Sequence, residues 1–442
     1  MTLFLVGSLA LLGWYRNASM PDVGEPFDVR SFVSVSIPDD RNAFTYYRGA
    51  TELFVGEPAT ATRGGPQGVG SRDNFEETME KGWPLANDDY RRWLSANRPA
   101  LDLWRRGTEC SQALEIPPAE LGLLNLPDCG PPRRLARLSL LEAARVSAEG
   151  PPAEAWTWYR AALRFSRHVG MHAATLGRLV GIGAHATCVD PVLRWSSRRE
   201  LTASNLRQAL ADVLAIDGMT PPLSDNLKAE YLFCCANVEE STAGWSGVAL
   251  RLTGYRERMH RSLNLIYANW LSQADRPRFQ RTAAAGREWM LFEIGPAARP
   301  NPKVLSPAEI ENRCGLPEHS TEAALVSLLM PNIVSFFEAV DRERARQAAL
   351  VLGLALELYH REHGQFPAAL DELVKERYLK SIPADPFGHG EPFHYRREAD
   401  GRQGAVLWSV WSDGIDQHGK IEADREREAA TGDKIFRIAT PR

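Results

Sequence analysis

The chain has 442 residues, which is too long for one ordinary hydrophobic core, so two or three domains are expected. Hydrophobic residues make up 44% of it and charged residues 24%, which is a globular composition and excludes a wholly disordered chain. The formal net charge of −4 provides no basic surface for a nucleic acid, and we therefore exclude nucleic acid as a partner.

The first notable segment is apolar and spans Leu3–Tyr15. It is shorter than the roughly 20 residues that cross a bilayer, and it lacks the basic leader and the cleavage site of a signal peptide. Its Trp-Tyr-Arg end is typical of the membrane interface. We predict that residues 1–16 are part of a single-pass anchor in the bacterial inner membrane, whose earlier residues lie further upstream. The alternative is a buried N-terminal helix of a soluble protein.

Residues 17–130 are predicted to be a mixed, loop-rich helical region. Residues 60–72 are rich in glycine, but they do not open a helix after a strand as a phosphate-binding loop does, so we predict a surface loop. Cys110 and Cys129 flank a proline-rich stretch, and they either form a disulfide in an oxidising compartment or stay free. None of the six cysteines forms a CxxC pair, which excludes zinc-ribbon and thioredoxin-type sites.

Residues 131–294 are predicted to be a helical domain. Apolar residues such as Leu135, Leu138 and Leu141 recur at helical spacing, and successive helices with short connections predict an antiparallel helical array. Residues 295–334 are rich in proline near their start, and they are predicted to be a linker and a connecting helix.

Three short strings in the helical domain invite functional interpretations. Residues 181–186 match GxGxxA without a preceding strand, so we predict close helix packing instead of dinucleotide binding. His168 and His172 are four residues apart, as metal ligands on one helix face are, but partly exposed histidines are the simpler expectation. Glu239 and Glu240 lack a second acid at catalytic spacing and are predicted to lie at a solvated helix end.

Residues 335–442 are predicted to be an α+β module with one long helix and a small antiparallel sheet. The helix is expected from Asp341 to Gly364, because glycine there suits a left-handed helix stop. A short helix over 368–375 and strands over 393–397, 405–411 and 434–439 follow. The long helix has an apolar stripe made of Ala345, Ala349, Leu352, Leu356 and Tyr359.

Two further features of this module are predicted from single residues. Asp385 lies between two prolines and is expected to be buried and to cap the turn that they form. His360 and His363 end the long helix three residues apart and could bind a metal ion. The simpler expectation is a solvated helix C-terminus, where a positively charged side chain is mildly favoured.

A series of short motifs follows in the module, and its residues are Tyr359, Gly364, Phe366-Pro367, Leu370, Leu373, Tyr378-Leu379, Pro383-x-Asp385-Pro386-Phe387-Gly388 and Ser412-x-Gly414-x-Asp416. The order of these motifs resembles the globular domain of the type II secretion major pseudopilin, which implies the same α+β fold. The chain as a whole resembles bacterial membrane-anchored proteins that carry such a tail, which implies an envelope location. About 330 residues separate the module from the N-terminus, and no prepilin-peptidase site precedes it, so pilus assembly does not carry over.

The resemblance also implies an ion site, because the major pseudopilin carries a calcium ion in the corresponding loop. Asp413 and Asp416 are the candidate calcium ligands, and Asp424 or Asp433 is a candidate third carboxylate. The alternative is a pair of Asx turns, in which both aspartates accept hydrogen bonds from nearby backbone amides.

The chain contains no GxSxG, HExxH, Walker A or CxxC string, so we assign no catalytic or cofactor-binding residue. We expect a non-enzymatic, envelope-associated binding or structural protein, mostly periplasmic, with an envelope protein as partner and a link to secretion. The alternatives are a hydrolase with an unrecognised site in the helical domain and a soluble helical scaffold.

Overall fold

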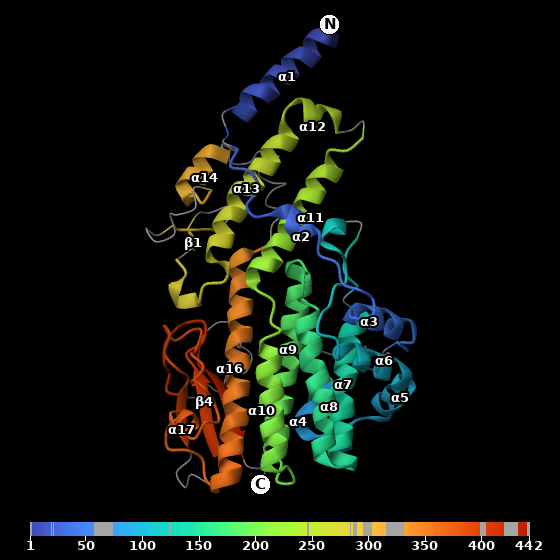
Figure 1. Ribbon diagram of the computed structural model, residues 1–442, viewed down its shortest axis with the longest axis vertical. Helices are drawn as coiled ribbons and strands as arrows, with labels where there is room; N and C mark the ends of the chain where they lie inside the picture. The colour runs from blue at the N-terminus through green and yellow to red at the C-terminus, as the bar shows by residue number, and fades with distance from the viewer. Residues whose placement is uncertain are drawn as a thin grey trace, which may run out of the picture.

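The computed structural model describes most of the chain and is mainly helical, with 62% helix and a small three-stranded antiparallel sheet near the C-terminus. This confirms the predicted fold class at that level. The molecule is elongated, and its long helices run along its long axis (Figure 1). The described residues are 2–18, 20, 22–56, 74–122, 125–128, 130–244, 247–282, 284–285, 290–294, 303–314, 331–397, 404–419 and 432–439.

The first part of the chain consists mostly of short helices joined by loops. Asparagine side chains start several of them, since the Asn42 carboxamide accepts from the amide of Phe44 and the Asn87 carboxamide from that of Tyr90. The helices are α1 (Thr2–Ala18), α2 (Val29–Val33), α3 (Ala43–Glu52), α4 (Asn74–Lys81), α5 (Asp88–Ala96) and α6 (Arg98–Thr108).

The middle of the chain consists of longer helices that pack on their neighbours in sequence, α7 on α8, α8 on α9 and α11 on α13. Two-residue strands β1 (Ala284–Ala285) and β2 (Leu291–Phe292) pair antiparallel beside them and were not predicted. The helices are α7 (Gly130–Glu149), α8 (Trp156–His168), α9 (Thr175–Ser196), α10 (Ala203–Asp217), α11 (Leu223–Ser241), α12 (Val248–Leu252), α13 (Tyr255–Ala274) and α14 (Pro307–Cys314).

The glycines of the GxGxxA string lie inside α9 and serve helix packing, as predicted. A Cβ atom at Gly181 would overlap the carbonyl oxygen of Ser166 on α8, whereas nothing lies within 4 Å of a Cβ at Gly183. The absent side chain at Gly181 therefore lets α8 and α9 approach each other closely.

The long C-terminal helix, α16, spans Ile333–His363 and starts eight residues earlier than predicted. The reason is a cap that the apolar stripe does not reveal, because the Asn332 side chain accepts from the amide of Ser335. The helix ends as predicted, at Gly364, whose φ is +70°. All five residues of the predicted stripe are buried.

The short helix that follows, α17 (Glu372–Lys375), is only half as long as predicted. The Glu372 carboxylate accepts from the amides of Ala368 and Ala369, and this fixes a turn where the first helical residues were expected.

The sheet contains the three predicted strands in the order β3-β4-β5, all antiparallel. They are β3 (His394–Arg397), β4 (Gly404–Ser409) and β5 (Lys434–Ala439). β4 stops two residues short of the prediction, because the buried carboxylate of Asp385 binds the Ser409 hydroxyl (2.9 Å) and the Val410 amide (3.2 Å). Asp385 also accepts from the amide of Phe387 (3.0 Å), so it caps its turn as predicted.

The C-terminal module shares its core with the helical domain. One continuous set of buried side chains extends from α3 through α7–α10 to α16 and the sheet, and α16 packs directly on α9 and α10. A second core joins α11, α13 and the first turns of α16. The predicted boundary at residue 335 thus falls within a helix that belongs to both cores.

A buried charge cluster fastens α16 to the helical domain. The Glu343 carboxylate on α16 bonds to the guanidinium groups of Arg167 on α8 and Arg178 on α9, and each of the three side chains is 1% exposed. Gln347 extends the cluster, since its Oε1 lies 3.0 Å from Arg167 and 2.9 Å from the His185 ring. Burial alone would raise the pKa of Glu343, but the charges of the two arginines outweigh it and hold that pKa at about 2.

Candidate functional site

The predicted ligands Asp413 and Asp416 lie in one loop directly after β4. Asp413 accepts from the Ile415 amide (3.1 Å), and Asp416 accepts from the His418 amide (2.7 Å), so each makes the Asx turn that was the alternative to metal binding. Asp416 also accepts from the Trp408 indole (2.9 Å). These bonds fix the loop without any ion.

Asp433 comes to the same loop from the residue before β5. Its Oδ2 accepts from the amides of Gln417 (3.1 Å) and Gly419 (2.9 Å), while Asp413 reaches back to the amide of Gly432 (2.9 Å). The buried oxygens Asp433 Oδ1 and Gln417 Oε1 have no hydrogen-bond partner in the described part of the chain. The other candidate third ligand, Asp424, lies outside the described residues.

The pKa of Asp433 depends on the two other carboxylates of the loop. Burial raises the pKa of Asp433, and the negative charges of Asp416 and Asp413 add to the rise. Asp433 Oδ1 and Gln417 Oε1 are hard oxygen donors of the kind that calcium takes, which fits the implied ion. Over the described residues, however, no group of three or more histidine, cysteine, aspartate or glutamate side chains has the geometry to hold a metal ion.

Three histidines of the two pairs contact protein groups: His168, His360 and His363. His168 is the last residue of α8 and is fully buried, with its ring nitrogens 2.7 Å from the Tyr47 hydroxyl and 3.0 Å from the Cys110 carbonyl oxygen. The prediction of a partly exposed His168 was therefore wrong. The His360 ring stacks on Phe366 and the His363 ring on Tyr359, so only His363 remains at a solvated helix end.

The remaining predictions about single side chains can be placed as follows. Glu239 lies at the exposed end of α11 and pairs with Arg256 and His260, as expected of a solvated position. Cys110 carries a free thiol, while Cys129 lies outside the described residues, as does the glycine-rich stretch 60–72.

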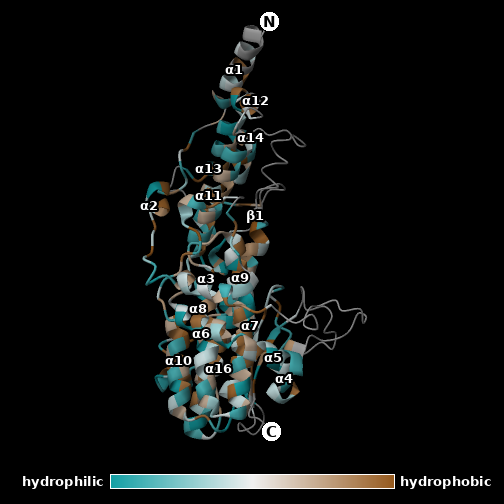
Figure 2. Ribbon diagram, turned by 90° about the vertical axis from the view of Figure 1, so that its right-hand side faces the viewer, coloured by the Kyte–Doolittle hydropathy of each residue, from teal (hydrophilic) through white to brown (hydrophobic). Residues whose placement is uncertain are grey.

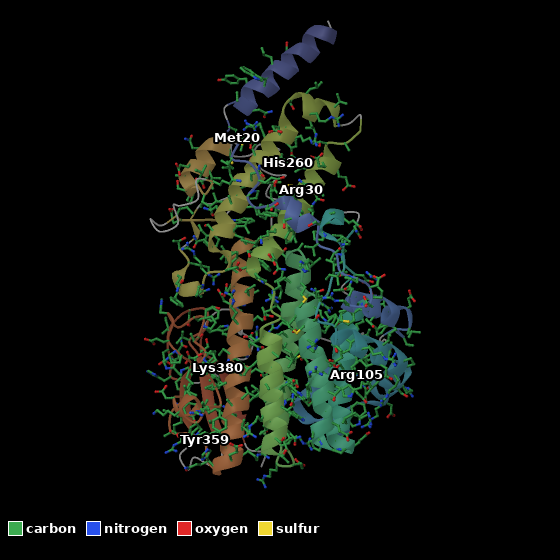
Figure 3. All side chains as sticks on the ribbon, in the orientation of Figure 1. Met20, Arg30, Arg105, His260, Tyr359 and Lys380 are labelled. Atoms are coloured by element: carbon green, nitrogen blue, oxygen red, sulfur yellow. The ribbon has the colours of Figure 1, made fainter. Side chains whose placement is uncertain are left out.

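Helix α1 extends from one end of the molecule in two perpendicular views (Figure 1, Figure 2). Its last turns touch the body, where Gly13 lies against the backbone of Leu252 and Arg261 donates to the carbonyl oxygens of Asn17 and Met20. Met20, at the foot of α1, is buried in the second core (Figure 3).

Large apolar side chains of α1 are open to solvent, with Leu11 68%, Trp14 69% and Tyr15 69% exposed. Such a group of neighbouring exposed apolar residues is typical of a surface that contacts a membrane or another protein. Nevertheless, among the described residues no helix has both the length and the apolar character that crossing a membrane requires.

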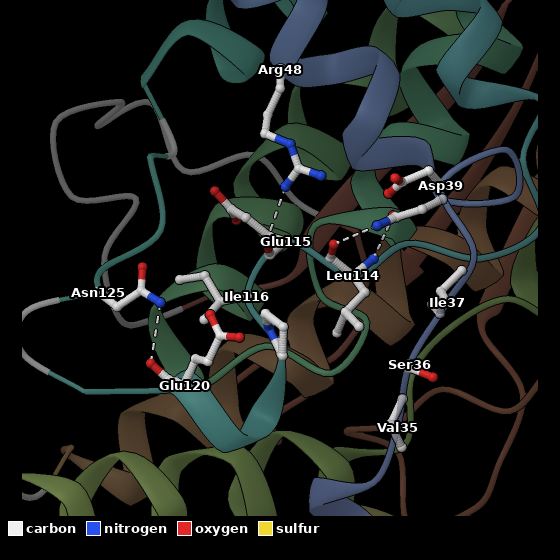
Figure 4. Close-up of a pocket in the computed structure, with 12 residues that line it drawn as sticks. Val35, Ser36, Ile37, Asp39, Arg48, Leu114, Glu115, Ile116, Glu120 and Asn125 are labelled. Atoms are coloured by element: carbon white, nitrogen blue, oxygen red, sulfur yellow. Dashed lines mark hydrogen bonds between the residues drawn. The ribbon is translucent and has the colours of Figure 1, made fainter.

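A polar hollow of about 350 Å³ lies between the 35–39 segment and the loop that follows α6 (Figure 4). Several of its hydrogen-bonding groups pair with each other. The Asn42 side chain donates to the carbonyl oxygen of Leu114 and accepts from its amide, and Arg48 donates to the carbonyl oxygen of Glu115. We therefore interpret the hollow as a place where hydrogen bonds hold the loop in position, and we do not interpret it as a binding site.

A second, mostly apolar pocket lies on the other side of the same loop, between that loop, the turn from α8 to α9, and α11. Its titratable side chains are Glu115, His172 and Glu230, which the sequence placed far apart. The spacing of His172 relates it only to His168, and neither glutamate belongs to a motif, so no sequence signal predicts this group.

Comparison with known proteins adds no relative, since no family model, no curated protein and no solved structure matches the chain.

Proposed function

We propose that this protein is a non-enzymatic binding or structural protein of the bacterial envelope, attached to the inner membrane through α1 with most of the chain on the periplasmic side. The observation that carries the proposal is the exposed apolar surface of α1. Burying Leu11, Leu12, Trp14 and Tyr15 in a membrane would remove this surface from water, at about 1.5–3 kcal/mol for each aliphatic side chain.

The C-terminal region acts as a pseudopilin-like structural module in this proposal. A 31-residue helix with a glycine stop, followed by three antiparallel strands, is the order of elements that the resemblance implies. Because α16 is covered by α9 and α10, it has no free face for a polymerising contact like that of a pilin helix. A role beside a secretion apparatus, with an envelope protein as partner, therefore fits better than a role as a pilus subunit.

The membrane attachment is tested by fractionating cells that produce the full chain or a Leu11→Lys, Leu12→Lys variant. We expect the original chain in the membrane fraction and a shift of most of the variant to the soluble fraction, because two cations oppose insertion of the apolar face. The control is Leu214→Lys on α10, a leucine of similar exposure (45%) far from α1 in the sequence.

Recovery of the original chain wholly in the soluble fraction would reject the attachment and favour the soluble scaffold. Equal distribution of the double variant and the original would show that α1 does not hold the protein at the membrane.

Calcium binding at Asp413 and Asp416, with Asp433 as third carboxylate, is a separate part of the proposal. The unpaired oxygens of Asp433 and Gln417 support it. Isothermal titration of calcium into the full chain is expected to give heat and a raised melting temperature, and Asp413→Asn or Asp416→Asn should remove both effects. Asp371→Asn, at an exposed position, is the control. If the original chain gives no heat and no thermal shift with calcium, calcium binding is rejected.

A further inference from the structure

The apolar pocket beside α9 has the size of a small-molecule site. Its volume is about 180 Å³. An engineered cavity of about 150 Å³ is enough to bind benzene. Three separate segments enclose it, and the lining residues are Glu115, Ile116, Leu121, Asn125, Leu126, Pro127, Met171, His172, Ala173, Ala174, Thr175, Leu176, Glu230 and Phe233.

The acidic and basic side chains that line this pocket favour one sign of charge. Glu115 and Glu230 are its two acids, and no lysine or arginine lines it. His172 adds no positive charge, because burial lowers its pKa and keeps the ring neutral near pH 7. The pocket therefore combines apolar walls with an electrostatic preference for a positively charged group.

Both carboxylates are held in place by the protein through one oxygen each. Glu230 uses Oε2 to accept from the amide and the hydroxyl of Thr175, each at 2.8 Å, and its Oε1 takes no part in these two bonds. Glu115 uses Oε1 to accept from the amide of Asp128 at 3.0 Å. Burial raises the pKa of Glu115 to about 7, which a bound cation would reverse.

The turn that forms the pocket wall is strained. His172 has a φ of +54°, a conformation that is unfavourable for a non-glycine residue and that persists only where its surroundings enforce it. Here Asn226 of α11 donates to the carbonyl oxygens of Gly170 and Ala173, both at 2.8 Å. The buried Nδ1 of His172 has no hydrogen-bond partner in the part of the chain that the structure describes.

We infer that this pocket binds a small organic cation, with its ammonium group against Glu115 and Glu230 and its apolar body against Leu121, Met171 and Phe233. The unpaired His172 nitrogen is a further acceptor for an N–H of the same ligand. This inference concerns binding by the helical domain and does not depend on the attachment of α1 to a membrane.

The test is isothermal titration of the full chain with three probes that share a ring and differ in charge: benzylammonium, benzyl alcohol and benzoate. We expect benzylammonium to bind, benzyl alcohol to bind at least about tenfold more weakly, and benzoate to give no heat. Affinity for benzylammonium, which stays protonated in this range, should rise by about tenfold from pH 6 to pH 8 as Glu115 ionises. The charged groups that act on Glu115 are Asp128, which raises its pKa, and Arg48, which lowers it. Burial raises the pKa of Glu230 as well, so both acids favour tighter binding at the higher pH.

A fourth probe separates a free amine from the ammonium of a lipid headgroup, since both share this chemistry. Phosphorylethanolamine should bind poorly because no lining residue is positively charged. If it binds as tightly as benzylammonium, then the natural ligand is a headgroup, and the claim that the pocket selects an apolar body is overturned.

The variants Glu115→Gln and Glu230→Gln keep an oxygen for the internal hydrogen bonds and remove one charge each. We expect each variant to bind benzylammonium about tenfold or more weakly and to bind benzyl alcohol with nearly unchanged affinity. Glu120→Gln is the matched control, because Glu120 lines only the neighbouring polar hollow. The proposal is overturned if no probe binds at millimolar concentration, if benzoate binds as well as benzylammonium, or if Glu120→Gln has the same effect in variants that melt normally.

Discussion

At the scale of single residues, the Glu343 carboxylate is the clearest example of a charge whose role depends on its surroundings. It is buried between Arg167 and Arg178, and removing it would leave two cations in the core without the carboxylate that bonds to both. Such a loss is far more costly than the loss of a surface ion pair, because water cannot solvate the charges that remain.

We therefore expect Glu343→Gln to lower the free energy of unfolding by about 3–5 kcal/mol in chemical denaturation. Glu338→Gln is the control, because that residue pairs with Arg342 at the surface and should cost at most about 1 kcal/mol. Similar losses for both would contradict the assignment of a buried, charged cluster.

Glu343 should also make the free energy of unfolding depend on pH. Because the folded pKa of Glu343 is about 2, below its ordinary value, its contribution is fully present above about pH 4.5. That contribution should be lost as the pH falls from about 4.5 towards 2, since the unfolded chain then binds the proton more readily. The measurement is the unfolding free energy over this range, and Glu343→Gln should flatten the slope.

Two glycines of α9 make an internal comparison. Gly181→Ala should destabilise the protein by about 1–3 kcal/mol, because the new Cβ would overlap the backbone of α8. Gly183→Ala has open space and should be neutral or stabilise by up to about 1 kcal/mol through helix propensity. The melting temperatures of both variants test this prediction. Equal changes in melting temperature would mean that Gly181 is not a packing contact.

At the scale of elements, the end of β4 is set by a residue from another segment. A β-strand pattern continues to Trp411, yet the strand stops at Ser409 because Asp385 takes the next amide and the Ser409 hydroxyl. The turn around Asp385 and the sheet are thus one unit, held by a buried carboxylate.

Replacing Asp385 by Asn should cost about 1–3 kcal/mol, because a carboxamide nitrogen would face the amide of Val410 and leave it unpaired. Asp371→Asn, at an exposed position without a side-chain cap, should change stability by less than about 0.5 kcal/mol. Thermal unfolding of the two variants tests this, and an unchanged Asp385→Asn variant would contradict it.

At the scale of the whole molecule, the C-terminal module depends on the helical domain for part of its core. Its long helix presents Glu343, Gln347 and Gly353 to α8, α9 and α10, so cutting the chain at residue 335 would expose a buried charge and a packed apolar face.

We expect residues 335–442, produced alone, to unfold without a cooperative transition, whereas the full chain should melt cooperatively. Circular dichroism during heating and the dispersion of amide signals in an NMR spectrum measure this. A sharp melt and well-dispersed signals from the fragment would show that the module is an independent domain.

Local features of this protein were determined by the sequence alone. The apolar stripe of α16, its stop at Gly364, the three C-terminal strands, the turn at Asp385 and the small-residue string at Gly181 each have a sequence pattern that lies within a few residues. Side-chain period, backbone freedom and proline geometry act over that range, so they leave a readable pattern.

The tertiary structure decided what distant residues do together. His168 is buried because Tyr47 and Cys110 surround it, and Glu343 is charged because two arginines more than 160 residues away flank it. The pocket of Glu115, His172 and Glu230 likewise exists only where a loop, a strained turn and α11 meet. Burial and electrostatic pairing depend on distance in space, and separation along the chain does not reveal them.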